Sequence, residues 1–144
     1  MNDEFEYVTT AAHVKIYEAG NEIFDALLTE VSELSKKKPE ATMSPGKVKI
    51  VNRVLKDLLT FLKDEPEGKY LEELDDDALP QVSDAVLIMV QFRAALQKFV
   101  GRYRRYVPAL GETAWVTEEL LAELEQITDE EDQEEDEEEE PGAI

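Results

Sequence analysis

The 144-residue sequence predicts an all-α fold: an elongated antiparallel helical bundle of three long or medium helices, then a short C-terminal helix and a disordered acidic tail. Three observations predict it. Apolar residues recur every three or four positions in three long segments, which is the period of a helix. Strand-like alternation and Asn-Gly or Asp-Gly turns are missing. An acidic block closes the chain, so we expect one domain over residues 1–128 and a low-complexity tail over 129–144.

The first helix is predicted over residues 10–38, and Pro39 ends it. Its heptad-like apolar stripe, of the kind found in coiled coils, comprises His13, Tyr17, Gly20, Phe24, Leu27, Val31 and Leu34, flanked by Ile16, Ile23 and Leu28. The second helix begins with Ser44 as N-cap and Pro45 at the first helical position. It continues to about Lys63 with the same spacing.

A break at residues 64–68 and one or two turns around residues 70–74 precede the third helix. This helix is predicted from Leu79 or Pro80 to Val107. Its first half, residues 85–92, is apolar on almost every side, which predicts a central position in the core.

Residues 108–116 are predicted to be a connection that contains Gly111 and the only tryptophan, Trp115. Thr117 is a good N-cap for a fourth helix that runs to about Thr128. Val116 is placed to pack against Leu121 as a hydrophobic staple.

Helix length favours self-association. At about 1.5 Å per residue, the first and third helices are roughly 43 and 39 Å long, while the second and fourth are roughly 28 and 17 Å. The shorter helices cannot shield the longer pair over its full length. The sequence therefore predicts a homodimer or another homo-oligomer, since a self-complementary stripe can pair with its own copy.

Composition excludes several classes of site. The chain has no cysteine, so thiolate zinc sites and cysteine nucleophiles are excluded, and its single histidine, His13, is predicted to be a packed or partly exposed side chain. The longest apolar run, residues 85–90, is far shorter than a membrane span. The acidic start does not resemble a secretory signal. We expect a soluble cytoplasmic protein that needs no cofactor and does not enter a membrane.

The charge is unevenly distributed. The formal net charge is −20, from 35 acids and 15 bases, and residues 129–140 contain 11 of the acids. The bases fall mainly between residues 36 and 63 and between residues 93 and 105. On helical geometry they form two basic stripes, which predict binding of nucleic acid or of an acidic partner. The stripe residues are Lys49, Arg53 and Lys56 on the second helix and Lys98, Arg102 and Arg105 on the third.

Two arguments weigh against the basic stripes as a nucleic-acid site. Bases near a helix C-terminus are favoured by the helix dipole, and Tyr103 and Tyr106 are predicted to be buried and unavailable for stacking. The acidic tail is a solubilising extension, a competitor that covers the basic stripes, or a lure for a basic partner.

A magnesium site is the enzymatic alternative that composition leaves open, because it needs only oxygen ligands. Glu30 and Glu33 lie three apart on one helix face, and Asp76 and Asp77 belong to a later acidic cluster. These clusters resemble the paired acidic motifs of all-helical nucleoside triphosphate pyrophosphohydrolases of the MazG type, although the second cluster here precedes the apolar helix. The resemblance implies a magnesium-dependent nucleotide hydrolase with these four ligands.

The sequence is best explained by a non-enzymatic protein–protein interaction module: an adaptor, assembly factor or regulator that acts through an oligomeric helical bundle. The first alternative is a nucleic-acid-binding or nucleic-acid-mimicking regulator whose basic stripes are modulated by the tail. The hydrolase is the second alternative.

Overall fold

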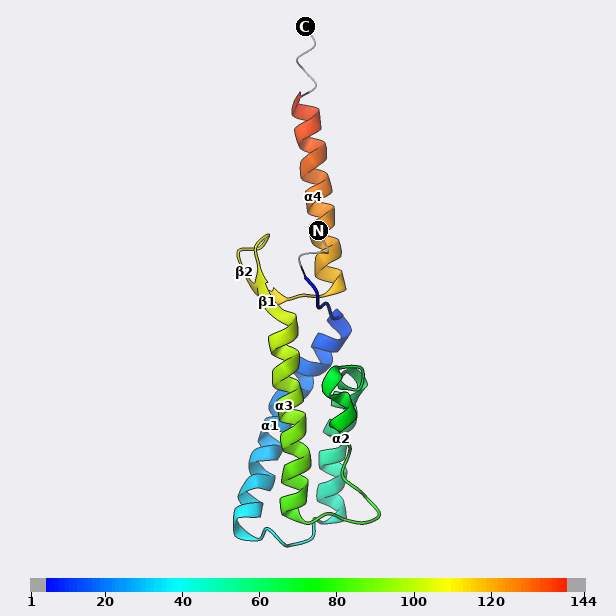
Figure 1. Cartoon of the computed structure of the whole chain (residues 1–144), viewed down its shortest axis with the longest axis vertical. Helices are drawn as coiled ribbons and strands as arrows, with labels where there is room; N and C mark the ends of the chain where they lie inside the picture. Colours follow the sequence, from blue (N-terminus) through cyan, green and yellow to red (C-terminus); the bar gives the residue numbers. More distant parts are fainter. Residues whose placement is uncertain (1–4, 140–144) are drawn as a thin grey trace. The chain divides into compact units, whose positions relative to one another are not determined.

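The computed structural model describes residues 5–139, with side chains to residue 133, and is mostly helical (Figure 1). Four α-helices, one 3-10 helix and two strands are present in this part of the chain. They are α1 (Ala11–Lys37), α2 (Pro45–Leu62), η2 (Pro66–Tyr70), α3 (Val82–Tyr103), β1 (Arg104–Val107), β2 (Glu112–Trp115) and α4 (Glu118–Glu139). The chain divides into a helical unit, Ala12–Gly101, and a terminal unit, Met1–Ala11 with Arg102–Ile144.

The core of the helical unit joins α1, α2 and α3, which lie side by side in Figure 1. Aromatic rings connect all three. The Phe61 ring on α2 lies 4.7 Å from that of Phe99 on α3, and Tyr17 on α1 lies 5.8 Å from the same Phe99 ring. Further along, Phe24 and Phe92 bring α1 and α3 together with ring centres 6.5 Å apart. These four buried phenylalanine rings and the half-buried Tyr17 explain why the apolar stripes of the three helices face one another.

Local sequence signals set the ends of α1 and α2. The α1 and α2 bounds agree with the predicted ones to within a residue or two. Ser44 accepts a hydrogen bond from the Lys47 N–H at 3.2 Å, as an N-cap does, and Pro45 is the first helical residue. His13 is half-buried with its ring 6.0 Å from that of Phe61, which confirms its packed position.

The loop after α1 is tied to the start of α3. The Met43 N–H donates to the Pro80 carbonyl at 2.8 Å, and the Val82 N–H donates to the Ala41 carbonyl at 2.8 Å. Gly68 in η2 lies against the end of α2, where a Cβ would come within 2.5 Å of the Leu62 carbonyl oxygen. Only glycine fits this close approach.

The long loop between η2 and α3 is fastened to α2 by Asn52. The Asn52 Nδ2 donates to the Leu74 carbonyl and the Leu74 N–H donates to the Asn52 Oδ1, both at 2.8 Å. Asn52 and Leu74 are buried. This amide clamp satisfies both backbone groups of a buried loop residue, as a buried backbone requires.

Leu87 departs from the prediction that residues 85–92 lie centrally in the core. Ala85, Met89 and Phe92 are buried, but Leu87 is 63% exposed. This segment of α3 is therefore not covered on every side within the helical unit.

The prediction that helix three continues to Val107, with no strands, is wrong. α3 ends at Tyr103, and β1 pairs antiparallel with β2 in a register that places Tyr106 opposite Thr113. Tyr106 and Val107 favour strands, and pairing with β2 outweighs their helical spacing. The turn is completed by Gly111, whose φ of 69° suits glycine.

The terminal unit has a small core of its own. Its buried side chains are Val107, Val116 and Leu124, against which Phe5, Val8, Ala114, Leu120 and Leu121 pack. The N-terminal segment joins through Thr9, which forms a parallel bridge with Thr117. Glu119 also reaches back, since its Oε2 accepts a hydrogen bond from the Ala11 N–H at 2.7 Å. Val116 and Leu121 belong to one cluster, as the predicted staple requires.

Replacing Thr117 by alanine should lower the free energy of unfolding of the terminal unit by about 1 kcal/mol, the usual cost of losing an N-cap. The Thr117 Oγ1 accepts a hydrogen bond from the Leu120 N–H at 3.0 Å. Thr117→Ser keeps the hydroxyl and is the control. Hydrogen exchange at the Leu120 amide measures the effect, and equal exchange in the two variants would contradict it.

α4 is longer than predicted. It extends through Glu139, beyond the expected end at Thr128, because glutamate is a good helix former even where no apolar stripe continues. Ile127, the last apolar residue before the expected end of this helix, is 51% exposed. The structure therefore differs from the predicted tail over residues 129–139, while residues 140–144 of that tail lie outside the described residues.

Within residues 5–139, none of the helices combines the length and the apolar character that crossing a bilayer demands. The same conclusion was expected from the short apolar runs of the sequence.

Candidate functional site

A groove between α1 and α2 is the candidate functional site of the helical unit. Its volume is about 300 Å³. It is lined by Leu27, Glu30, Val31, Glu33, Leu34 and Lys37 of α1 and by Lys47, Ile50 and Val51 of α2. We call this the α1–α2 groove. Most of its floor is apolar, and its charged residues stand on both helices.

Two large apolar side chains on α1 and α2 remain exposed. Ile50, which lines the groove, is 51% exposed, and Ile23, one helical turn before Leu27, is 55% exposed. Leu27 and Leu34 are half-buried. The sequence places Leu27 and Leu34 on the apolar stripe of α1, and the structure leaves them incompletely covered. Apolar side chains grouped in this way are typical of an interaction surface.

The charges of the groove are balanced. Glu30 and Glu33 contribute two negative charges, and Lys37 and Lys47 contribute two positive ones. Glu33 also forms an exposed ion pair with Lys36, with Oε1 and Nζ 3.0 Å apart. Such an exposed pair adds little stability. The lining acids and lysines balance and Lys36 adds one positive charge beside them, so the groove carries none of the negative excess of a chain whose net charge is −20.

The three bases predicted to form a stripe on α2 lie on one side of that helix. Lys49, Arg53 and Lys56 line one pocket of about 530 Å³, together with Pro45, Asn52, Asp57 and Asp76. The pocket is not purely basic, because Asp57 and Asp76 are part of it and Glu73 approaches the Lys56 Nζ to 3.9 Å. The amide clamp holds this acidic loop against the basic stripe, which lowers its attraction for an external anion.

The second basic stripe does not form as predicted. Lys98 is exposed on α3 in the helical unit, whereas Arg105 lies on β1 and shares no helix face with Arg102. Arg102 is half-buried, with its guanidinium 5.8 Å from the centre of the Tyr7 ring. The error follows from the strand, since helical spacing no longer applies after Tyr103.

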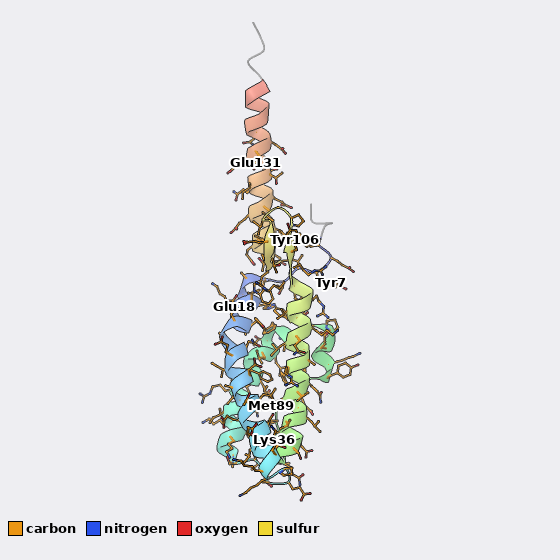
Figure 2. All side chains as sticks on the ribbon, turned by 90° about the vertical axis from the view of Figure 1, so that its left-hand side faces the viewer. Tyr7, Glu18, Lys36, Met89, Tyr106 and Glu131 are labelled. Carbon is orange, nitrogen blue, oxygen red and sulfur yellow. The ribbon has the colours of Figure 1, made fainter. Side chains whose placement is uncertain are left out.

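Sequence reasoning also missed an exposed aromatic residue. Tyr106 was expected on the buried stripe, but on β1 it is 60% exposed, and Figure 2 labels it on the hairpin. Arg104 and Arg105, its neighbours, are also exposed. The terminal unit thus presents an exposed tyrosine directly after two exposed arginines. The strand-favouring pair Tyr106 and Val107 before Pro108 is the signal that could have found it.

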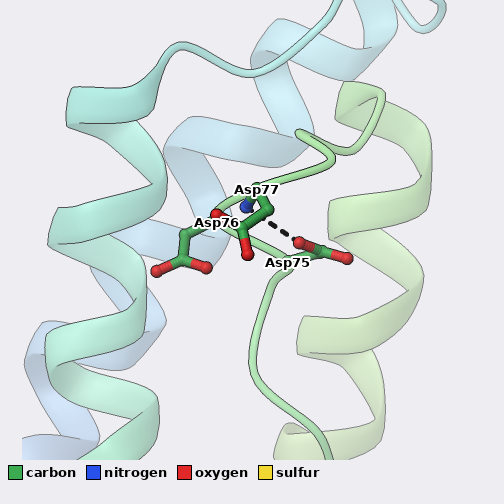
Figure 3. Close-up of side chains that lie close together, drawn as sticks. All are labelled: Asp75, Asp76 and Asp77. Atoms are coloured by element: carbon green, nitrogen blue, oxygen red, sulfur yellow. Dashed lines mark hydrogen bonds between the residues drawn. The ribbon is translucent and has the colours of Figure 1, made fainter.

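The four carboxylates of the predicted magnesium site are not brought into one pocket. Glu30 and Glu33 line the α1–α2 groove, while Asp76 lines the pocket beside Lys49. Asp76 and Asp77 group instead with Asp75, with carboxylate oxygens within 4.8 Å of one another (Figure 3). All three are exposed in the loop before α3, and exposed acidic groups of this kind are common without a metal.

Hydrogen bonds to the backbone explain the local shape of this acidic turn. The Asp75 Oδ1 accepts from the N–H groups of Ala78 and Asp77, both at 2.9 Å. These bonds favour the ionised carboxylate and hold the pKa of Asp75 below its ordinary value.

The turn formed by Asp75 should therefore weaken in acid. A lowered pKa in the folded state means that the stabilisation is present above the pKa of the unfolded chain and is lost as the pH falls through the lower, folded pKa. Amide exchange at Ala78, followed from about pH 6 to about pH 2, measures this loss against the intrinsic exchange rate. Asp75→Asn keeps an acceptor oxygen but does not titrate, so its protection should not show the step; a step of equal size would contradict the assignment.

Comparison of the chain with protein-family models finds no match, and comparisons with curated proteins and with solved structures find none either.

Proposed function

We propose that this protein is a non-enzymatic protein–protein interaction module, an adaptor, assembly factor or regulator, whose α1, α2 and α3 act as an elongated antiparallel bundle within an oligomer. The α1–α2 groove is its interaction surface. The observation that supports this most directly is the exposure of Ile23 and Ile50 beside the half-buried Leu27 and Leu34.

The physical argument is the cost of exposed apolar surface. Fully burying a single isoleucine side chain is worth about 1.5–3 kcal/mol. Ile50 lines the groove, and Ile23 lies on α1 one helical turn before Leu27, the first lining residue of that helix, so one partner that extends past the groove can cover both. Lys37 and Lys47 with Glu30 and Glu33 supply a charged rim, and an apolar centre with a polar rim is the usual anatomy of a protein interface.

Site-specific photo-crosslinking tests the proposal in the source cell. A benzophenone amino acid at position 23 should give one discrete adduct. The crosslinked protein in that adduct is then identified, and another copy of this chain counts as a partner. The same group at position 87, an equally exposed apolar position on α3, is the matched control. Ile50→Glu should remove the position-23 adduct. An adduct pattern identical at positions 23 and 87, or unaffected by Ile50→Glu, would argue against the groove.

The exposed hairpin favours a second candidate function, binding of single-stranded nucleic acid. Tyr106 offers a ring for base stacking, and Arg104 and Arg105 offer charge for phosphates. The acidic segment from residue 129 would compete for the same arginines. The basic stripe of α2 contributes less to this function, because the acids of its own pocket offset it.

Retention on immobilised single-stranded nucleic acid at low salt tests this second function. Removing residues 129–144 should strengthen retention, because the competing carboxylates are gone. Tyr106→Ala in the shortened chain should weaken it, with Tyr70→Ala, another exposed tyrosine, as the control. If neither the full chain nor the shortened chain is retained on the immobilised strand, the protein does not bind single-stranded nucleic acid in this way.

A further inference from the structure

The α1–α2 groove has a charge arrangement that identifies its partner. We infer that the groove binds the same groove of a second copy of this chain, in a two-fold arrangement that places the acid pair Glu30 and Glu33 opposite the lysines Lys37 and Lys47 of the other copy. This inference rests on the proposed interaction module and names its partner.

Self-complementarity is the first support. A two-fold interface brings one surface against its own copy, so each feature must face a feature that suits it. The groove has an apolar floor with two acids and two lysines around it. The apolar floors of the two copies can therefore pack together. The acid pair of each copy then faces the lysines of the other copy across the two-fold axis. A groove of one charge sign would instead have repelled its copy.

The charge of the rest of the chain is the second support. With a net charge of −20, two copies repel each other over most approaches. The α1–α2 groove does not share this negative excess, since its two lining acids and two lining lysines balance and Lys36 lies beside Glu33. Two copies can thus approach at this face without the like-charge repulsion that acts elsewhere.

The size of the surface sets the expected affinity. From Leu27 to Lys37 the groove side of α1 is about 15 Å long, and adjacent helix axes are about 8–10 Å apart. A face of this size covers a few hundred Å², well below the roughly 800 Å² that each partner buries in a standard interface. We therefore expect a weak, reversible dimer with a dissociation constant no tighter than the micromolar range.

A charge-exchange experiment tests the inference with the full chain. The acid-reversed variant combines Glu30→Lys with Glu33→Lys, and the base-reversed variant combines Lys37→Glu with Lys47→Glu. By light scattering across the micromolar range, the wild type should approach twice the 16.4 kDa chain mass. Each variant alone should dimerise at least tenfold more weakly, and an equal mixture of the two should recover dimers.

Two controls keep the result interpretable. Lys98→Glu with Asp84→Lys changes exposed charges on α3 outside the groove and should leave dimerisation unchanged. Circular dichroism of every variant should match the wild type, because the altered side chains are exposed. If a variant unfolds, Ile50→Glu in the groove against Leu87→Glu outside it replaces the pair, with dimer loss expected only for Ile50→Glu.

Failure of this inference differs from failure of the proposed function. A wild type that stays at 16.4 kDa throughout, or variants that do not recover dimers when mixed, would overturn the second copy as partner. If position-23 crosslinks to another protein persist in that case, the interaction module stands. Monomers combined with crosslinking that is equal at positions 23 and 87 would overturn both.

Discussion

Replacing Phe99 by alanine should lower the free energy of unfolding of the helical unit by about 3–5 kcal/mol, the usual cost of removing a large buried ring. Phe99 is buried and its ring touches those of Tyr17 and Phe61, so the three helices lose a shared contact. Domains are commonly stable by only about 5–15 kcal/mol. The expected loss is therefore a large part of the total.

Urea unfolding followed by circular dichroism measures this change. Leu87→Ala, on the same helix but exposed, is the matched control and should change stability by no more than about 0.5 kcal/mol. A loss below about 1 kcal/mol for Phe99→Ala would show that the rings do not form a common core.

Replacing Asn52 by leucine should destabilise the helical unit by about 2–4 kcal/mol, because it leaves two buried backbone groups of Leu74 without partners. The volume of the side chain changes little, so the loss reports the missing hydrogen bonds. The acidic loop before α3 should also detach from α2.

Hydrogen exchange at the Leu74 amide, together with urea unfolding, measures both effects. Arg53→Leu introduces the same side chain at the next position, which is exposed, and serves as control. Unchanged protection of Leu74 in Asn52→Leu would contradict the amide clamp.

The helices could be predicted because their signals are local. The spacing of apolar residues in α1 and α2 reports which side faces the core, and the caps Ser44 and Thr117 mark where helices begin. The stripe of Lys49, Arg53 and Lys56 was predictable for the same reason, since residues three and four apart share one side of a helix.

The hairpin could not be predicted in this way because strands depend on pairing. Tyr106 falls three residues after Tyr103 and so continues the helical spacing of α3. What makes residues 104–107 a strand is β2, which begins eight residues after Arg104 and supplies the hydrogen-bond partners. The pairing of β1 with β2 explains both why Tyr106 is exposed and why Arg105 shares no helix face with Arg102.

The candidate site could be predicted from the sequence only in part. Ile23 stands beside the predicted stripe of α1, but its exposure depends on which helices pack next to α1. Ile50 lies on α2 between Lys49 and Arg53, and the predicted apolar spacing of that helix does not include it. The loop acids near Lys56 reach the basic stripe only through the amide clamp of Asn52 and Leu74.

The bridge between Thr9 and Thr117 has a consequence for the order of events during synthesis on the ribosome. The helical unit, Ala12–Gly101, is continuous in sequence and can begin to fold once that stretch has emerged. The segment that ends at Ala11 must wait for Thr117 and α4, which are made after the helical unit. Residues 5–11 therefore stay open to proteases and chaperones until that later part of the chain has been translated.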